Sequence, residues 1–116
     1  MNQHQVIEIN EAEDPRIAVY RTMREGDFLR AQGLFVAEGE NLVLRLAAST
    51  YAMHSVLVAR PRAEKILHLL PQTVPCYIAA EELLNEIVGF QFHRGVIACG
   101  QRPPLPEAAA WYAVNP

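Results

Sequence analysis

Several short stretches of the chain consist mainly of apolar residues, without the alternation that marks a strand with one wet face. Apolar runs of this length are typical of strands that are buried on both faces. A further stretch, HQVIEI over residues 4–9, alternates weakly and predicts a short edge strand. We therefore expect buried strands over residues 34–39, 54–59, 75–79 and 95–100.

Between these strands, apolar residues return at every third or fourth position, which is the period of an amphipathic helix. Asp14 and Pro15 suit a helix start, because Asp can cap the first turn and Pro fits the first helical position. The segment 24–33 predicts a turn or a short helix that ends at Gly33. The expected helices cover about residues 14–23, 40–49, 61–70 and 81–88.

Alternating strands and helices, with strands apolar throughout, predict an α/β fold. We expect a three-layer α/β/α sandwich in which helices cover both faces of a mostly parallel sheet. Ligands of such sheets usually bind in the loops at the carboxyl ends of the strands.

Length and composition restrict the fold and the location. The chain has 116 residues, which suits one compact domain, and 51% of them are hydrophobic, which is enough for a real core. No apolar run reaches the roughly 18 residues of a membrane span. The N-terminal stretch is polar and acidic, unlike a signal peptide. We therefore expect a cytoplasmic protein.

The cysteines and the charge refine this picture. Cys76 and Cys99 each lie in a strand-like apolar run, which favours buried, reduced thiols over a disulfide. The net charge of −3 argues against a general polyanion binder but leaves room for a local basic face. Every basic residue except Lys65 is Arg, which suits bidentate contact with phosphate. A genome rich in G and C would explain the same preference.

The chain carries no self-contained active site. The histidines and cysteines lack the spacing of metal ligands, so we expect no metal. There is no GxSxG, P-loop or GxGxxG motif. Cys99 lies near His93 in sequence, but an apolar strand is a poor setting for a nucleophile. We expect no catalytic residue in this chain.

The first candidate site is the stretch AEGENLVLR, residues 37–45. Gly39 joins a strand to a helix, and the amides of a helix N-terminus can bind phosphate oxygens. Asn41 can donate and accept hydrogen bonds toward a base or a ribose, and Arg45 lies one helical turn further on. An ordinary strand–helix turn with capping residues would show the same pattern.

The second candidate site is GFQFHRGVIACG, residues 89–100. His93 and Arg94 can contact phosphate or a base edge, and Gly95 lets a partner backbone approach closely. Phe90 and Phe92 alternate with polar residues, so their rings are core if they face inward and a stacking surface for a base if one faces out. The alternative is a tight strand entry with a solvated His–Arg pair.

Together the two stretches point to a family. GLFVAEGENLVLRLAAS followed by FHRGVIA resembles, in order and spacing, the N-terminal substrate-binding domain of SpoU/TrmH-type RNA 2′-O-ribose methyltransferases. DPRIAVYR, which precedes them, is similar to the lead-in of some members. The resemblance covers about residues 14–102.

The resemblance implies a fold similar to kink-turn-binding ribosomal proteins and a role in holding ribosomal or transfer RNA. It assigns RNA binding to residues in both candidate stretches. Members of the family often have Gln at the position of Arg94. In the family a knotted domain, absent here, binds S-adenosylmethionine, catalyses RNA methylation and forms the homodimer, so we expect this chain alone to be monomeric or weakly associated. The implied RNA-binding residues are Gly39, Asn41, Arg45, His93, Arg94 and Gly95.

The expected organisation has three parts. Residues 1–13 form an N-terminal extension or short edge strand, and residues 14–100 form the RNA-binding domain. Residues 101–116 form a proline-rich linker and the start of the missing domain, as in part of a longer protein. Two alternatives remain: a stand-alone RNA-binding module of the same fold, or a small α/β domain that binds a metabolite or a protein.

Overall fold

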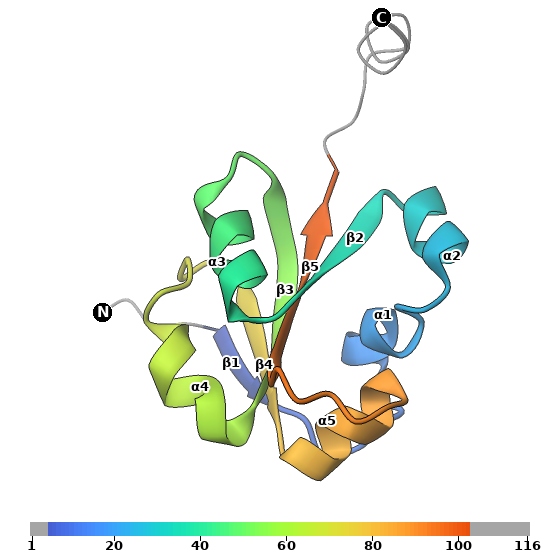
Figure 1. The fold of residues 1–116 in the computed structure, drawn as a ribbon, viewed down its shortest axis with the longest axis vertical. Coiled ribbons are helices and arrows are strands. Elements are labelled where there is room, and N and C mark those ends of the chain that lie inside the picture. The colour runs from blue at the N-terminus through green and yellow to red at the C-terminus, as the bar shows by residue number, and fades with distance from the viewer. Residues whose placement is uncertain (1–4, 103–116) are drawn as a thin grey trace, which may run out of the picture.

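The computed structural model describes residues 5–102, which form one sheet with helices on both sides (Figure 1). Within this range the sheet has five strands in the order β1-β4-β3-β5-β2. Residues 5–8 of the edge strand predicted over 4–9 are confirmed as a strand, and among the described strands this one pairs only with β4. The strands are β1 (Gln5–Glu8), β2 (Leu34–Glu38), β3 (Ala52–Ala59), β4 (Pro75–Ala79) and β5 (Val96–Gln101).

The helices cover both faces of the sheet, which confirms the three-layer α/β/α sandwich (Figure 1). One face carries η1 (Pro15–Ile17), α1 (Ala18–Arg21), α2 (Gly26–Ala31) and α5 (Glu81–Val88). The other face carries α3 (Glu40–Ala48) and α4 (Arg60–Leu67). Each side therefore has its own apolar core, and the sheet lies between the two.

The sheet is mixed, with β5 as the one described strand that runs against the others. β1, β4 and β3 pair in parallel, whereas β5 pairs antiparallel with both β3 and β2. The segment after α5 stays at the carboxyl end of β3, where the amide of Ala59 donates to the carbonyl of Gly95 at 2.8 Å. Because β5 starts at the end of the sheet where β3 finishes, it runs back along β3.

Three elements differ in extent from the sequence prediction. The helix expected over 14–23 is a 3₁₀ turn followed by the short α1, and the hydroxyl of Thr22 bonds the carbonyls of Ala18 and Val19 at its end. Asp14 caps this segment as predicted, accepting from the Arg16 amide at 2.9 Å. The second difference is β3, which begins two residues before the predicted start at 54. The third is α4, which ends at Leu67 rather than at about residue 70.

The thiols lie where the sequence predicted them. Cys76 and Cys99 are both fully buried and unbonded to each other, one in each core. Burial raises the pKa of each thiol to about 11. Such thiols are unreactive at neutral pH.

Two other predictions concern the ends and the membrane. In the described part of the chain, no helix is long and apolar enough to cross a bilayer. Gln101 is the last residue of β5, and the rest of the predicted linker, from residue 103 onward, lies outside the described residues. So do residues 1–4 of the predicted N-terminal extension.

Candidate functional site

The two candidate stretches meet at one end of the sheet. The amide of Gly39, after β2, donates to the carbonyl of Val96 at 2.8 Å, and the amide of Ala59, after β3, donates to the carbonyl of Gly95 at 2.8 Å. The start of β5 is therefore held between the carboxyl ends of β2 and β3. This is the end of an α/β sheet at which ligands usually bind.

Gly39 lies directly under the side chain of Arg94. A Cβ atom on Gly39 would stand 3.0 Å from Nη1 and 3.1 Å from Cδ of Arg94. The backbone of Gly39 has φ 96° and ψ 156°, a conformation that is essentially restricted to glycine. Glycine therefore allows both the turn into α3 and the close approach of the arginine.

Arg62 covers Gly95 in the same way. A Cβ atom on Gly95, which has φ 75°, would stand 3.0 Å from Cγ and 3.2 Å from Nε of Arg62. Arg62 lies in the first turn of α4. The sequence prediction missed this residue. The sequence does carry a signal for Arg62: an Arg-Pro-Arg sequence directly follows a predicted strand whose carboxyl end lies at the site.

Gly39, Arg62 and Arg94 line an open cavity of about 360 Å³. Arg62 and Arg94 make no ion pair with any residue from 5 to 102, so their guanidinium groups are available to a ligand. Glu38 and Glu40 line the same cavity and balance their charge. The cavity thus offers donors and acceptors side by side, which suits a ligand with both. We call it the glycine-corner cavity; its lining is Glu38, Gly39, Glu40, Asn41, Leu42, Arg62 and Arg94.

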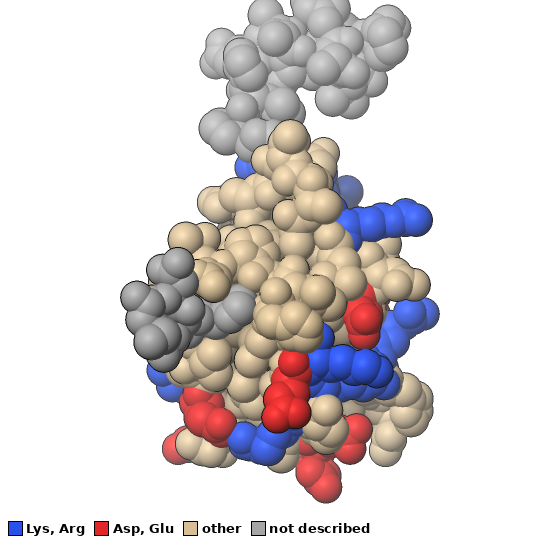
Figure 2. All heavy atoms as spheres, turned by 90° about the vertical axis from the view of Figure 1, so that its left-hand side faces the viewer, with Lys and Arg blue, Asp and Glu red and all other residues tan. Residues whose placement is uncertain are grey.

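The surface that carries α3 and α4 has the same mixed charge. Figure 2 shows Lys and Arg side chains interspersed with Asp and Glu on this side of the molecule. Arg60 is occupied, because its guanidinium donates to both carboxylate oxygens of Glu8, at 2.8 and 2.7 Å. This pair holds the pKa of Glu8 below its ordinary value. The cations free to meet a ligand at α4 are therefore fewer than the sequence suggests.

The remaining predicted residues lie around the cavity rather than in it. Arg45 is exposed on α3, one turn beyond Asn41, and does not line the cavity. His93 is exposed in the turn before Gly95 and also lies outside the lining. The structure thus brings Gly39, Asn41 and Arg94 together, with Gly95 beneath Arg62. Arg45 and His93 extend the same surface.

The two phenylalanines face inward, so the option of an outward stacking ring at this corner is wrong. Phe92 is 7% exposed, and its amide donates to Oδ1 of Asn85 at 2.8 Å. Phe90 is half-buried and packs edge-to-face on Phe92, with ring centroids 5.9 Å apart. The guanidinium of Arg24 covers the Phe90 ring at 4.4 Å from its centroid. These contacts fix the loop that presents His93 and Arg94.

Comparison with known proteins points to RNA methyltransferases. The chain is 29% identical over 109 residues to proteins described as uncharacterised tRNA/rRNA methyltransferases from Mycobacterium bovis and Mycobacterium tuberculosis. The match covers 90% of this chain but 38% of each relative, so the chain spans well under half of their length. This agrees with the predicted resemblance. No protein-family model matches the chain.

A solved structure supports the fold. The chain superposes on an rRNA methyltransferase from Sinorhizobium meliloti, whose crystal structure contains bound AdoMet, with a TM-score of 0.68 and 16% sequence identity. The superposition covers 88% of this chain and 39% of that protein. At this identity the likeness establishes the shared α/β fold.

Proposed function

We propose that this chain is the substrate-recognition domain of an S-adenosylmethionine-dependent RNA 2′-O-ribose methyltransferase that acts on ribosomal or transfer RNA. The relatives named as tRNA/rRNA methyltransferases support the enzyme class. Because the chain matches 38% of their length, we assign catalysis, cofactor binding and homodimer formation to the remainder of a longer protein. The cofactor would bind outside these residues.

The observation that carries the proposal is the convergence of two separate segments on one cavity. Residues 39–41 and Arg94 are far apart in the chain, yet Arg94 packs directly on the backbone of Gly39. A ligand in this cavity meets the guanidinium groups of Arg62 and Arg94, which make no ion pair within residues 5–102. It also meets the side-chain amide of Asn41 and the first turn of α3. Arginine guanidinium suits phosphate oxygens, and helix N-terminal amides suit the same atoms.

The two carboxylates in the cavity refine the mode of binding. Glu38 and Glu40 repel phosphate but accept hydrogen bonds from the amino groups of bases and from ribose hydroxyls. We therefore expect the RNA to be held by a few phosphate contacts from Arg62 and Arg94, with Arg45 and His93 beside them. Sugar or base edges would lie against the carboxylates. Such a site binds more weakly than a basic patch but selects for RNA.

The enzyme class is tested by methyl transfer with the longer protein. A preparation supplied with RNA and labelled S-adenosylmethionine is expected to yield a 2′-O-methylated nucleotide, identified after nuclease digestion. The His93→Ala/Arg94→Ala variant is expected to lose at least tenfold in methylation at low RNA concentration while it binds S-adenosylmethionine normally. A methyl group on a base, or unchanged methylation by the variant, would contradict the proposal.

A further inference from the structure

A β-bulge in β3 turns His54 toward the face of the sheet that carries α1 and α2. On β5, the neighbours Gly100 and Cys99 pair with Met53 and Ser55, which leaves His54 as the extra residue. Met53 packs against the core on the α3 side, whereas His54 lines a cavity on the opposite side. Bulges often re-aim a side chain next to a functional site.

A hydrogen-bond chain holds His54 in place. Nδ1 of His54 lies 3.0 Å from Oγ of Ser55, and this oxygen lies 2.7 Å from the hydroxyl of Tyr20. Ser55 and Tyr20 are fully buried, so the chain fixes one nitrogen of the imidazole from inside the core. Nε2 has no partner among residues 5–102 and is available to a ligand.

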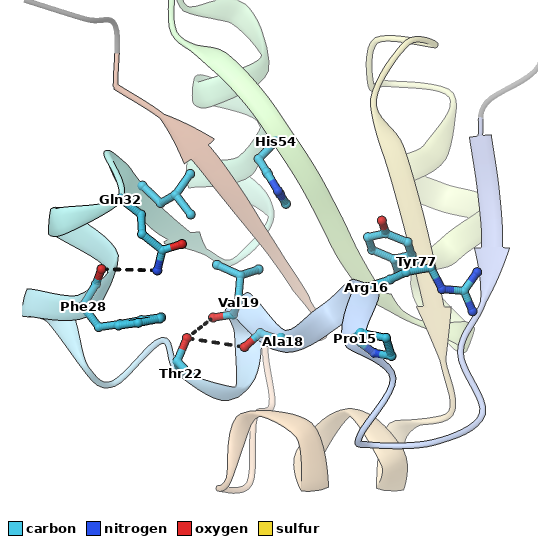
Figure 3. Close-up of a pocket in the computed structure, with 10 residues that line it drawn as sticks. Pro15, Arg16, Ala18, Val19, Thr22, Phe28, Gln32, His54 and Tyr77 are labelled. Carbon is cyan, nitrogen blue, oxygen red and sulfur yellow. Dashed lines mark hydrogen bonds between the residues drawn. The ribbon is translucent and has the colours of Figure 1, made fainter.

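His54 forms part of a groove of about 460 Å³, a volume within the range of small-ligand sites (Figure 3). One wall is apolar and includes Val19, Leu34 and the ring of Phe28, which is 51% exposed. Figure 3 shows Phe28, Val19 and Gln32 on one side of the groove, with His54 and Tyr77 on the other. We call this cavity the bulge groove.

Three polar atoms on the His, Tyr and Gln side chains of the bulge groove are without partners in the described part of the chain. Besides Nε2 of His54, they are the hydroxyl of Tyr77 and Oε1 of Gln32, whose amide nitrogen donates to the carbonyl of Phe28 at 3.4 Å. Tyr77 is only 8% exposed, but its hydroxyl reaches solvent, since no buried side-chain polar atom of residues 5–102 lacks a partner. An apolar wall with a few convergent polar atoms is the usual composition of a binding site.

We propose that the bulge groove holds one unstacked base of the RNA, an inference that rests on the proposed function. A base is planar, stacks on an aromatic ring such as Phe28, and carries several donors and acceptors along its edge. A Phe, Tyr or Trp side chain of a protein would fill the same volume but has at most one polar atom for His54, Tyr77 and Gln32 together. The polar atoms therefore favour a base over a protein segment.

A base in this groove would give the RNA a second contact, on the opposite face of the sheet from the glycine-corner cavity. His54 and Ala59 lie five residues apart on β3, roughly 17 Å at about 3.3 Å per residue, and Ala59 is at the glycine-corner end. The backbone of the RNA would contact the glycine-corner cavity, and one base would enter the groove. Such a base has to be unpaired, which restricts the substrate to loops, bulges or single strands.

The test is a titration of the ¹³C-methyl-labelled chain with single-stranded RNA hexamers of A, C, G or U. Methyl resonances of Val19 and Leu34 are expected to shift with the same affinity as those near the glycine-corner cavity. Phe28→Ala is expected to weaken binding about tenfold, as for loss of one stacked base. Tyr77→Phe removes one hydroxyl and is expected to change the preference among the four hexamers. The control is Leu69→Ala, because Leu69 is 50% exposed and does not line the groove.

The outcomes separate this inference from the proposed function. RNA binding that depends on Arg94 but leaves the groove resonances unshifted, with Phe28→Ala equal to wild type, overturns the bulge-groove site alone. No RNA binding by the wild-type chain overturns both. Free nucleoside monophosphates are titrated in the same way. If they shift the groove resonances equally and bind as tightly as the hexamers, the groove is a site for free nucleotides, which overturns the assignment to RNA.

Discussion

Replacing Gly39 by Ala tests whether the glycine-corner cavity depends on this residue. The backbone at Gly39, with φ 96° and ψ 156°, costs a residue with a side chain about 1–3 kcal/mol. The new Cβ would also stand 3.0 Å from Nη1 and 3.1 Å from Cδ of Arg94. Arg94 is exposed and its side chain can move away from the new Cβ, so we attribute the cost to the backbone conformation rather than to this contact. We expect Gly39→Ala to lower the free energy of unfolding by about 1–3 kcal/mol.

Urea unfolding, followed by circular dichroism, measures this change against two matched controls. Gly26→Ala has no positive φ, and its Cβ would meet only the end of Arg30 at 3.9 Å, so we expect a change within about 1 kcal/mol, in the stabilising direction. Gly33→Ala has φ 74° with nothing within 4 Å of the new Cβ, which isolates backbone strain at about 1–2 kcal/mol. If Gly39→Ala proves as harmless as Gly26→Ala, the reasoning is refuted. A double-mutant cycle with Arg94→Ala that shows strong coupling would instead move the cause to the side-chain contact.

Further predictions concern ionisation and the loop after α5. Hydrogen bonds from the side chain and backbone of Arg16 lower the pKa of Asp14 from 3.8 to about 2, so its cap stabilises the fold fully above about pH 4. The difference in unfolding free energy between wild type and Asp14→Ala should shrink as the pH falls from about 4 to 2. A difference that grows on acidification would contradict the lowered pKa of Asp14. Because burial raises the pKa of the Cys76 and Cys99 thiols to about 11, the native chain should react with a thiol reagent at pH 8 only as fast as it opens, and rapid labelling before unfolding would contradict this burial. Asn85→Ala removes the acceptor of the Phe92 amide and should cost about 1–3 kcal/mol in urea unfolding, whereas no loss would mean that the bond contributes little.

The sequence predicts the order and type of the main elements because both faces of the sheet are covered. Burial on both faces makes the strands read as apolar runs, and the helices between them keep a clear amphipathic period. The same property hides the direction of a strand, so Val96–Gln101 gives no sign that it runs against its neighbours. That direction depends on the loop after Gly89, which keeps the chain at one end of the sheet.

The site is predictable only in part, for a similar reason. Gly39 and Gly95 are visible because a glycine between a strand and its neighbour marks a special turn. The packing of Arg94 on Gly39 and of Arg62 on Gly95 joins segments that are distant in sequence, and periodicity carries no information on such pairs. The bulge at His54 is likewise invisible, because the extra residue is defined by the pairing with β5.

The most direct test of the central claim is the salt dependence of RNA binding by this chain. If Arg45, Arg62 and Arg94 each meet one phosphate, log K should fall with log salt at a slope of about −2 for single-stranded RNA. The Arg62→Ala/Arg94→Ala variant should bind more weakly, with a slope of about −0.7. The control is Arg21→Ala/Arg30→Ala, which removes the same formal charge from positions on α1 and α2 that line neither cavity and should keep the wild-type slope. Equal slopes and affinities for the two double variants would contradict binding of RNA at the glycine-corner cavity.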